Sequence, residues 1–333
     1  LAYWLFFMAA MIFAMAVIGA ITRLTESGLS IMEWAPIKGS LPPLSQAEWQ
    51  RLFDLYMLTD EYKIDNPDMG MAEFKTIFWW EWIHRLWGRL IGLAYALPLA
   101  YFWLRGQVPS WSKPWLIAGL LLGGLQGAIG WFMVHSGFGE RTDVSQYRLA
   151  LHLSMALALY VYVLILGLRF WEGRFPVVAA SASWLRAGVY TGFAVLAVTI
   201  VSGAFVAGLN AGLLYNEYPL MGDGLVPYEY AEQSPWIMNW FENAAAVQFN
   251  HRLLATLAGL LTLLIAWQGF FTEQAGERHW YAALGLAVIC QYILGVTTLL
   301  WAVPISLGSL HQAGAITLLG IYAVLAFKLY RRY

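Results

Sequence analysis

The chain has 333 residues, of which 60% are hydrophobic and only 12% are charged. A soluble domain of average composition carries about 25% charged residues, so a chain this apolar is typical of a protein embedded in lipid. The net charge of -1 gives no sign of a nucleic-acid partner, and the single cysteine, Cys290, excludes an internal disulfide and a thiolate metal cluster.

Eight apolar runs are long enough to cross a bilayer as helices, which takes about 20 residues each. The runs are continuously apolar rather than alternating, and this pattern favours an all-α integral membrane protein over a β-barrel. We predict transmembrane helices at 3–21, 78–104, 115–135, 147–169, 184–206, 244–270, 279–301 and 308–328.

Basic residues cluster at one set of helix ends, and acidic residues follow the other set. The basic residues are Arg105, Lys113, Arg169, Arg174, Arg186, Lys328, Arg331 and Arg332. The loop 206–243 carries acidic residues and has neither Lys nor Arg. By the positive-inside rule, both termini should therefore face the cytoplasm or the mitochondrial matrix.

The sequence repeats itself weakly, and corresponding residues recur at similar offsets. The pairs are His84 with His251, Arg85 with Arg252, Gln126 with Gln291, Gly130 with Gly295, and His152 with His311. An even number of predicted helices in each repeat keeps both repeats in the same orientation. The pattern predicts an N-terminal half, 1–170, and a C-terminal half, 171–333, each a four-helix bundle related to the other by pseudo-symmetry.

Four histidines lie a few residues inside the outer ends of the even-numbered predicted helices: His84, His152, His251 and His311. These helices all enter from the same side, so the four imidazoles should lie at one depth, near the outer surface. A histidine within a span is costly and usually faces the bundle interior, where it either bonds a neighbouring helix or binds a ligand.

Two facing imidazoles in a four-helix bundle can ligate a haem iron axially. Zinc would need further ligands, and no Cys or carboxylate accompanies each pair in both halves. We therefore predict one haem in each half, held by His84 with His152 and by His251 with His311. The other two histidines, His135 and His279, are expected at the membrane interfaces and receive no assigned role.

Arg85 and Arg252 directly follow the first histidine of each half. Two interpretations stay open for them. Either they pair with haem propionates through charge-assisted hydrogen bonds, or they extend toward lipid headgroups.

The two halves differ at the position three residues before the first histidine. It is Glu81 in the N-terminal half, and in the other half it is Gln248, since 251 − 3 = 248. A carboxylate on the same helix face as the histidine can move protons or stabilise a developing cation, whereas an amide cannot exchange protons. The difference predicts a catalytic N-terminal site and a C-terminal site that stores or relays electrons. The alternative is that Glu81 faces water at the headgroup level.

A polar string, Thr22 to Ser30, follows the first predicted helix directly, and we expect it to cap the N-terminal site. Together, the run Gly19 to Ser30, the run Glu81 to Arg85, and the four histidines resemble haem A synthase over nearly the whole chain. The resemblance is to the mitochondrial and related bacterial branch, because the outer loops lack the paired cysteines of the other branch.

The resemblance implies an oxidoreductase that converts the C8 methyl of haem O to the formyl group of haem A, for assembly of terminal oxidases. It implies that His84 and His152 bind the substrate haem, that Glu81 is catalytic, and that His251 and His311 ligate a cofactor haem b. The implied partners are an electron acceptor, haem O synthase and cytochrome oxidase assembly factors. The implied location is the bacterial or mitochondrial inner membrane.

Two other functions fit part of the pattern. A two-haem, bis-histidine electron-transfer cytochrome explains all four histidines, but it explains neither Glu81 nor the polar string. A haem or quinone transporter would use the histidines as transit ligands, although transporters more often show inverted repeats and broken helices.

Overall fold

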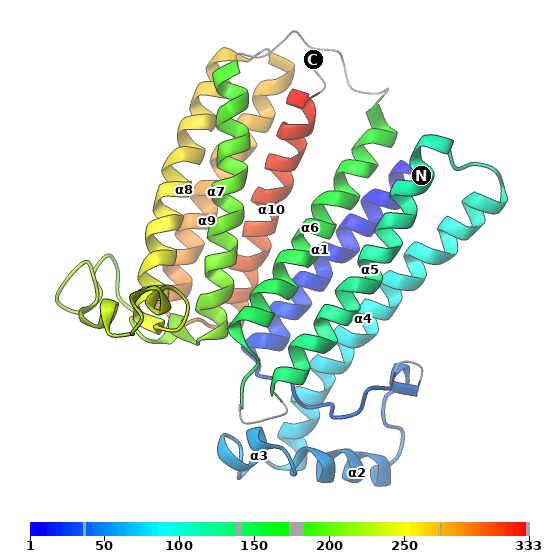
Figure 1. Ribbon diagram of the computed structural model, residues 1–333, viewed down its shortest axis with the longest axis vertical. Helices are drawn as coiled ribbons and strands as arrows, with labels where there is room; N and C mark the ends of the chain where they lie inside the picture. The colour runs from blue at the N-terminus through cyan, green and yellow to red at the C-terminus, as the bar shows by residue number, and fades with distance from the viewer. Residues whose placement is uncertain (36–37, 138–141, 173–182, 274, 331–333) are drawn as a thin grey trace. The chain divides into compact units, whose positions relative to one another are not determined.

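The computed structural model describes the chain except for residues 36–37, 138–141, 173–182, 274 and 331–333 (Figure 1). The described residues are helical or irregular, with no strand beyond an isolated bridge between Met221 and Gly224. The predicted all-α class is therefore confirmed. Of the basic residues used to predict orientation, Arg174, Arg331 and Arg332 lie outside the described residues.

The long helices coincide with the predicted spans to within a few residues, except that α4 begins earlier than predicted. They are α1 (Ala2–Leu24), α4 (Met71–Leu104), α5 (Lys113–Val134), α6 (Gln146–Trp171), α7 (Ser183–Gly208), α8 (Ala244–Thr272), α9 (Ala275–Leu300) and α10 (Ile305–Tyr330). Two shorter helices, α2 (Gln46–Tyr56) and α3 (Asp60–Ile64), were not predicted.

Among the described residues, seven helices are long and apolar enough to cross a membrane, namely all the long ones except α4. Large side chains stay exposed along these helices, as expected where lipid is the solvent; Leu121 is 67% exposed and Leu286 is 65% exposed. The chain is therefore a membrane protein. Helix α4 has 34 residues, which is ample length, but it carries Glu81, Arg85 and Arg89 within the predicted span.

Helix α4 begins at Met71 rather than near 78, because its first turns pack against α2 outside the apolar run. The buried cluster joining the two helices comprises Trp49, Leu52, Phe53, Tyr56, Phe74 and Phe78. Burying a large apolar side chain stabilises a fold by about 1.5–3 kcal/mol. That packing supports the helical conformation where membrane hydropathy gives no signal.

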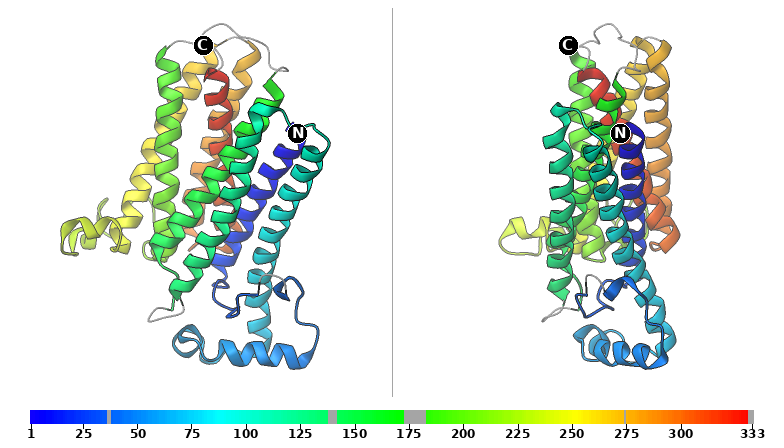
Figure 2. Two further views of the ribbon diagram at one scale, coloured as in Figure 1. Left: turned by 45° about the vertical axis from the view of Figure 1, so that its right-hand side comes forward. Right: turned by 90° about the vertical axis from the view of Figure 1, so that its right-hand side faces the viewer.

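The chain forms two compact units, Ala14–Leu159 and Leu1–Phe13 with Tyr160–Tyr333. In the second unit, α7, α8, α9 and α10 form a closed ring, each packing against two others, and they run side by side in the views of Figure 2. In the first unit, α4 contacts both α2 and α5. The division at residue 170 into two symmetric halves stays a prediction.

Glu61 on α3 is a buried acid outside the membrane spans. It is only 5% exposed, and its Oε2 atom has no hydrogen-bond partner within the described residues. Burial raises the pKa of Glu61 to about 8, and the negative charges of Glu81 and Asp143 add to the rise. The folded protein thus binds this proton more tightly than the unfolded chain.

This raised pKa predicts that the segment containing α2 and α3 loses stability as the pH rises from about 4.5 to 8. The reason is that ionising Glu61 is unfavourable only in the folded state. Glu61→Gln should remove this decline and raise the melting temperature at pH 8. Thermal unfolding at several pH values measures it, with the exposed Glu48→Gln as the control. If Glu61→Gln and the parent protein show the same pH dependence, the buried acid does not titrate in this range.

Candidate functional site

The first histidine of each half lies against a glycine of the preceding long helix. A Cβ added to Gly19 of α1 would lie 3.4 Å from His84 Nε2, and one added to Gly203 of α7 would lie 3.0 Å from His251 Cε1. The two glycines are related by 203 − 19 = 184. At Gly203 the added Cβ would be tighter than an ordinary contact, so the His251 ring would have to shift, whereas at Gly19 it would make an ordinary van der Waals contact with His84.

The second histidine of each half is placed in the same way. A Cβ on Gly130 of α5 would lie 2.9 Å from His152 Cε1, and one on Gly295 of α9 would lie 2.7 Å from His311 Cε1. The offset here is 295 − 130 = 165. The weak repeat in the sequence is thus matched by equivalent contacts within each half.

A glutamine lies one helical turn before Gly130 and another lies one turn before Gly295. Each contacts the histidine that packs on that glycine. Gln126 Nε2 donates to the His152 carbonyl oxygen at 3.1 Å and lies 3.1 Å from His152 Nδ1. Gln291 Nε2 donates to the His311 carbonyl oxygen at 2.8 Å and lies 3.1 Å from His311 Nδ1. The Oε1 atoms of both glutamines are buried, with no hydrogen-bond partner in the described part of the chain.

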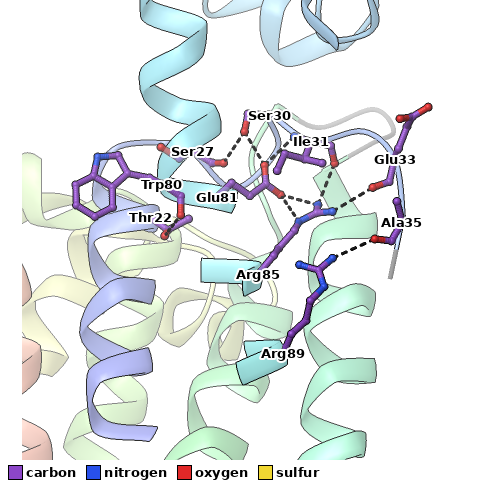
Figure 3. Close-up of polar contacts among 10 residues, drawn as sticks. All are labelled: Thr22, Ser27, Ser30, Ile31, Glu33, Ala35, Trp80, Glu81, Arg85 and Arg89. Atoms are coloured by element: carbon purple, nitrogen blue, oxygen red, sulfur yellow. Dashed lines mark hydrogen bonds and ion pairs between the residues drawn. The ribbon is translucent and has the colours of Figure 1, made fainter. Parts of the chain in front are cut away.

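Glu81 is 2% exposed, so the alternative in which it faces water is wrong. Ser30 Oγ donates to Glu81 Oε2 at 2.7 Å, and the Ile31 N–H donates to the same oxygen at 2.8 Å (Figure 3). Arg85 donates to Glu81 Oε1 from Nε at 3.0 Å and from Nη2 at 2.6 Å. Both carboxylate oxygens are therefore fixed, and the polar string supplies Ser30 as one of the donors.

Arg85 and Arg252, each directly after the first histidine of its half, hydrogen-bond the loop that follows α1 or α7. Arg85 donates to the carbonyl oxygens of Ile31 at 2.9 Å and Glu33 at 3.2 Å (Figure 3). Arg252 donates to those of Tyr215 at 2.8 Å and Glu217 at 3.0 Å. The loop residues correspond by the same offset, since 215 − 31 = 184 and 217 − 33 = 184. This role was not predicted, and a contact with haem propionates stays a prediction.

These arginine contacts are complete only in the N-terminal half. Arg85 Nε bonds Glu81, whereas the buried Nε of Arg252 and Oε1 of Gln248 have no hydrogen-bond partner within the described residues. The two halves also differ at Ser30, whose counterpart in the C-terminal half is Leu214 (30 + 184). A leucine side chain has no hydrogen-bond donor for an acid or an amide. The two halves therefore differ at several positions around Glu81 and Gln248.

The donor set fits a haem better than a zinc ion. The described residues contain no group of three or more His, Cys, Asp or Glu side chains that could hold a metal ion. The imidazoles instead occur as two half-buried rings in each half, each lying beside a glycine, which suits axial ligation of a flat macrocycle. The remaining histidines contact tryptophans, since His135 stacks on Trp131 with centroids 5.6 Å apart and His279 lies beside Trp280.

Three residues of the site escaped the sequence analysis as contributors: Gly19, Gly203 and Ser202. Ser30 lies in the polar string that was expected to cap the N-terminal site, but its hydrogen bond with Glu81 was not predicted. Ser202 Oγ lies 2.8 Å from His251 Nδ1. The constant offset of 184 between α1 with its loop and α7 with its loop is a signal that could have found both glycines. The serines lie at positions where the repeat is broken, so no internal comparison would reveal them.

Comparisons with known proteins show the family of the chain. A family model described as cytochrome oxidase assembly protein (COX15-CtaA) matches residues 2–323. A haem A synthase from Rhodospirillum centenum is 51% identical, over 96% of this chain and 86% of that protein. Haem A synthases from Maricaulis maris and Caulobacter vibrioides are 46% and 43% identical, over 95% and 99% of this chain and 92% and 96% of those proteins.

Gly130→Ala should displace the His152 imidazole, because the new Cβ would lie 2.9 Å from Cε1. Overpacking of this kind costs about 1–3 kcal/mol, so haem retention by this half should weaken about tenfold. The haem-to-protein ratio, read from the Soret absorbance, measures the effect. Gly124→Ala is the matched control on the same helix, where a Cβ meets nothing within 4 Å. Equal haem content in the two variants would contradict the placement of His152 as a ligand.

Proposed function

This chain belongs to the COX15-CtaA family of cytochrome oxidase assembly proteins, and from this membership and the two histidine pairs we infer that it acts as a haem A synthase. It is a membrane-embedded oxidoreductase whose substrate is haem O and whose product is haem A. The alternative of a two-haem electron-transfer cytochrome is not favoured, because the curated relatives covering nearly the whole chain are synthases.

We propose that haem O binds in the N-terminal half between His84 and His152, and that haem b binds in the C-terminal half between His251 and His311. The observation that carries this assignment is the buried Glu81 carboxylate, three residues before His84 and on the same helix face. The corresponding Gln248 cannot exchange a proton, so the C-terminal half lacks an equivalent group.

Haem b, when bound, supplies a redox-active iron that can accept electrons drawn from the substrate. Glu81 acts at the substrate methyl group, whose conversion to a formyl group builds positive character on carbon. With water as the oxygen source, this conversion adds one oxygen atom and releases four protons and four electrons, and the electrons pass to the proposed electron acceptor. Four hydrogen bonds from Ser30, Ile31 and Arg85 hold the carboxylate in one orientation. A carboxylate already fixed in this way needs no reorganisation to stabilise that charge or to accept a proton.

We propose further that α4 is an eighth membrane crossing and that the halves 1–170 and 171–333 form two pseudo-symmetric four-helix bundles. The equivalent glycine, glutamine and arginine contacts of the two halves support this arrangement. Both termini then lie on the cytoplasmic or matrix side of an inner membrane, and both haem sites lie near the outer side. An electron acceptor, haem O synthase and oxidase assembly factors are the proposed partners.

Glu81→Gln tests the assignment with little change in volume. Haem A formation should fall by about 100-fold or more, the usual contribution of a positioned acid–base group, while both haems stay bound. Haems extracted from the purified variant and separated by chromatography measure product and content together. Glu48→Gln, an exposed change on α2, is the control. Unchanged haem A formation would remove Glu81 from the chemistry, and loss of both haems would make its role structural.

A further inference from the structure

The imidazole of His251 is held in one tautomer by Ser202. Ser202 Oγ donates to the Thr199 carbonyl oxygen at 2.7 Å and lies 2.8 Å from His251 Nδ1. A hydroxyl has one proton, and a carbonyl oxygen can only accept, so His251 Nδ1–H donates to Ser202. The lone pair is therefore left on Nε2, the nitrogen that can bind an iron.

The imidazole of His84 has no such anchor. It makes no hydrogen bond within the described residues, although it lies over the glycine equivalent to that beneath His251. The residue corresponding to Ser202 is Ile18, since 202 − 184 = 18, and the one corresponding to Thr199 is Met15. An isoleucine side chain cannot accept the Nδ1 proton.

The two rings also differ in orientation. His251 turns Cε1 toward the glycine, at 3.0 Å from the added Cβ with Nδ1 and Nε2 both at 3.6 Å, whereas His84 turns Nε2 and Cδ2 toward it, at 3.4 and 3.8 Å. A half-turn about the Cβ–Cγ bond exchanges these two arrangements. Within the described residues, no hydrogen bond selects one of them for His84.

The other ligand of each half shows no comparable difference. His152 and His311 both lie 3.1 Å from the Nε2 of a glutamine that also bonds their own carbonyl oxygens. Because an amide N–H can only donate, these contacts leave the ring proton on Nε2, so the glutamines hold the backbone of His152 and His311 without selecting an iron-binding tautomer. The contrast that separates the two halves is therefore the one between His251, which has a hydroxyl partner, and His84, in the half that carries Glu81.

We propose that His84 is the exchangeable ligand of the substrate site and that Ser202 is a positioning residue that keeps the cofactor haem bound to His251. The proposal rests on the proposed function, in which one haem must enter and leave at each turnover while the other stays. A hydrogen bond from Nδ1–H fixes the ring and raises its basicity, and loss of such a partner typically weakens metal binding about 10–100-fold.

Haem transfer to excess apomyoglobin in detergent tests the proposal, with apomyoglobin as the probe. Transfer should show a fast and a slow phase. Ile18→Ser, which introduces the missing hydroxyl, should slow the fast phase about tenfold and leave the slow phase unchanged. Ser202→Ala should speed the slow phase by a similar factor and leave the fast phase unchanged. Ile18→Val and Ser202→Thr are the matched controls and should behave like the parent protein.

A redox titration separates positioning from a general structural effect. The Ser202 hydrogen bond increases the basicity of His251 and so stabilises the oxidised iron. Ser202→Ala should therefore raise one of the two midpoint potentials, and Ser202→Thr should restore it. The other midpoint potential should not change in either variant.

A single transfer phase, or phases that neither Ile18→Ser nor Ser202→Ala alters, would overturn the proposal. The porphyrin released in the fast phase tests the proposed function separately. Haem O or haem A in that phase supports both. If the fast phase responds to Ile18→Ser but releases haem b alone, His84 is exchangeable and the assignment of haem O to this half fails.

Discussion

An imidazole inside an apolar helix bundle needs both space and a polar partner, and the neighbouring helix must supply them. In this chain a glycine supplies the space at each of the four histidines. A glutamine or a serine supplies the partner at three of them. The rest of the site follows from this packing, because the depth of the histidines sets the depth of the arginine and of the acid or amide one helical turn away.

Much of the fold could be predicted from the sequence because membrane hydropathy is a local signal. The spans on α5, α6 and α8 agree with the structure to within about two residues at each end. Helix α2 and the early start of α4 could not be predicted in this way. They depend on burial of Trp49 against Phe74 and Phe78, a tertiary contact between segments distant in the chain.

The site was predictable where the two halves agree. The histidine pairs, Gln126 with Gln291 and Gly130 with Gly295 were visible as a repeat, and each occupies an equivalent place. The features that assign different roles to the halves lie where the repeat fails. Ser30, a loop residue 51 positions before Glu81, donates a hydrogen bond to it, and Ser202 lies 49 positions before its partner His251. No pattern along the chain links such residues.

The proposed roles of the two halves, one binding a substrate haem and the other a cofactor haem, can be tested from the porphyrins that the protein retains. These are extracted from purified protein, produced in cells that make haem O, and identified by chromatography and mass spectrometry. We predict haem b together with haem O, its hydroxylated form or haem A. Haem b alone, in cells that make haem O, would contradict these proposed roles and favour an electron-transfer cytochrome.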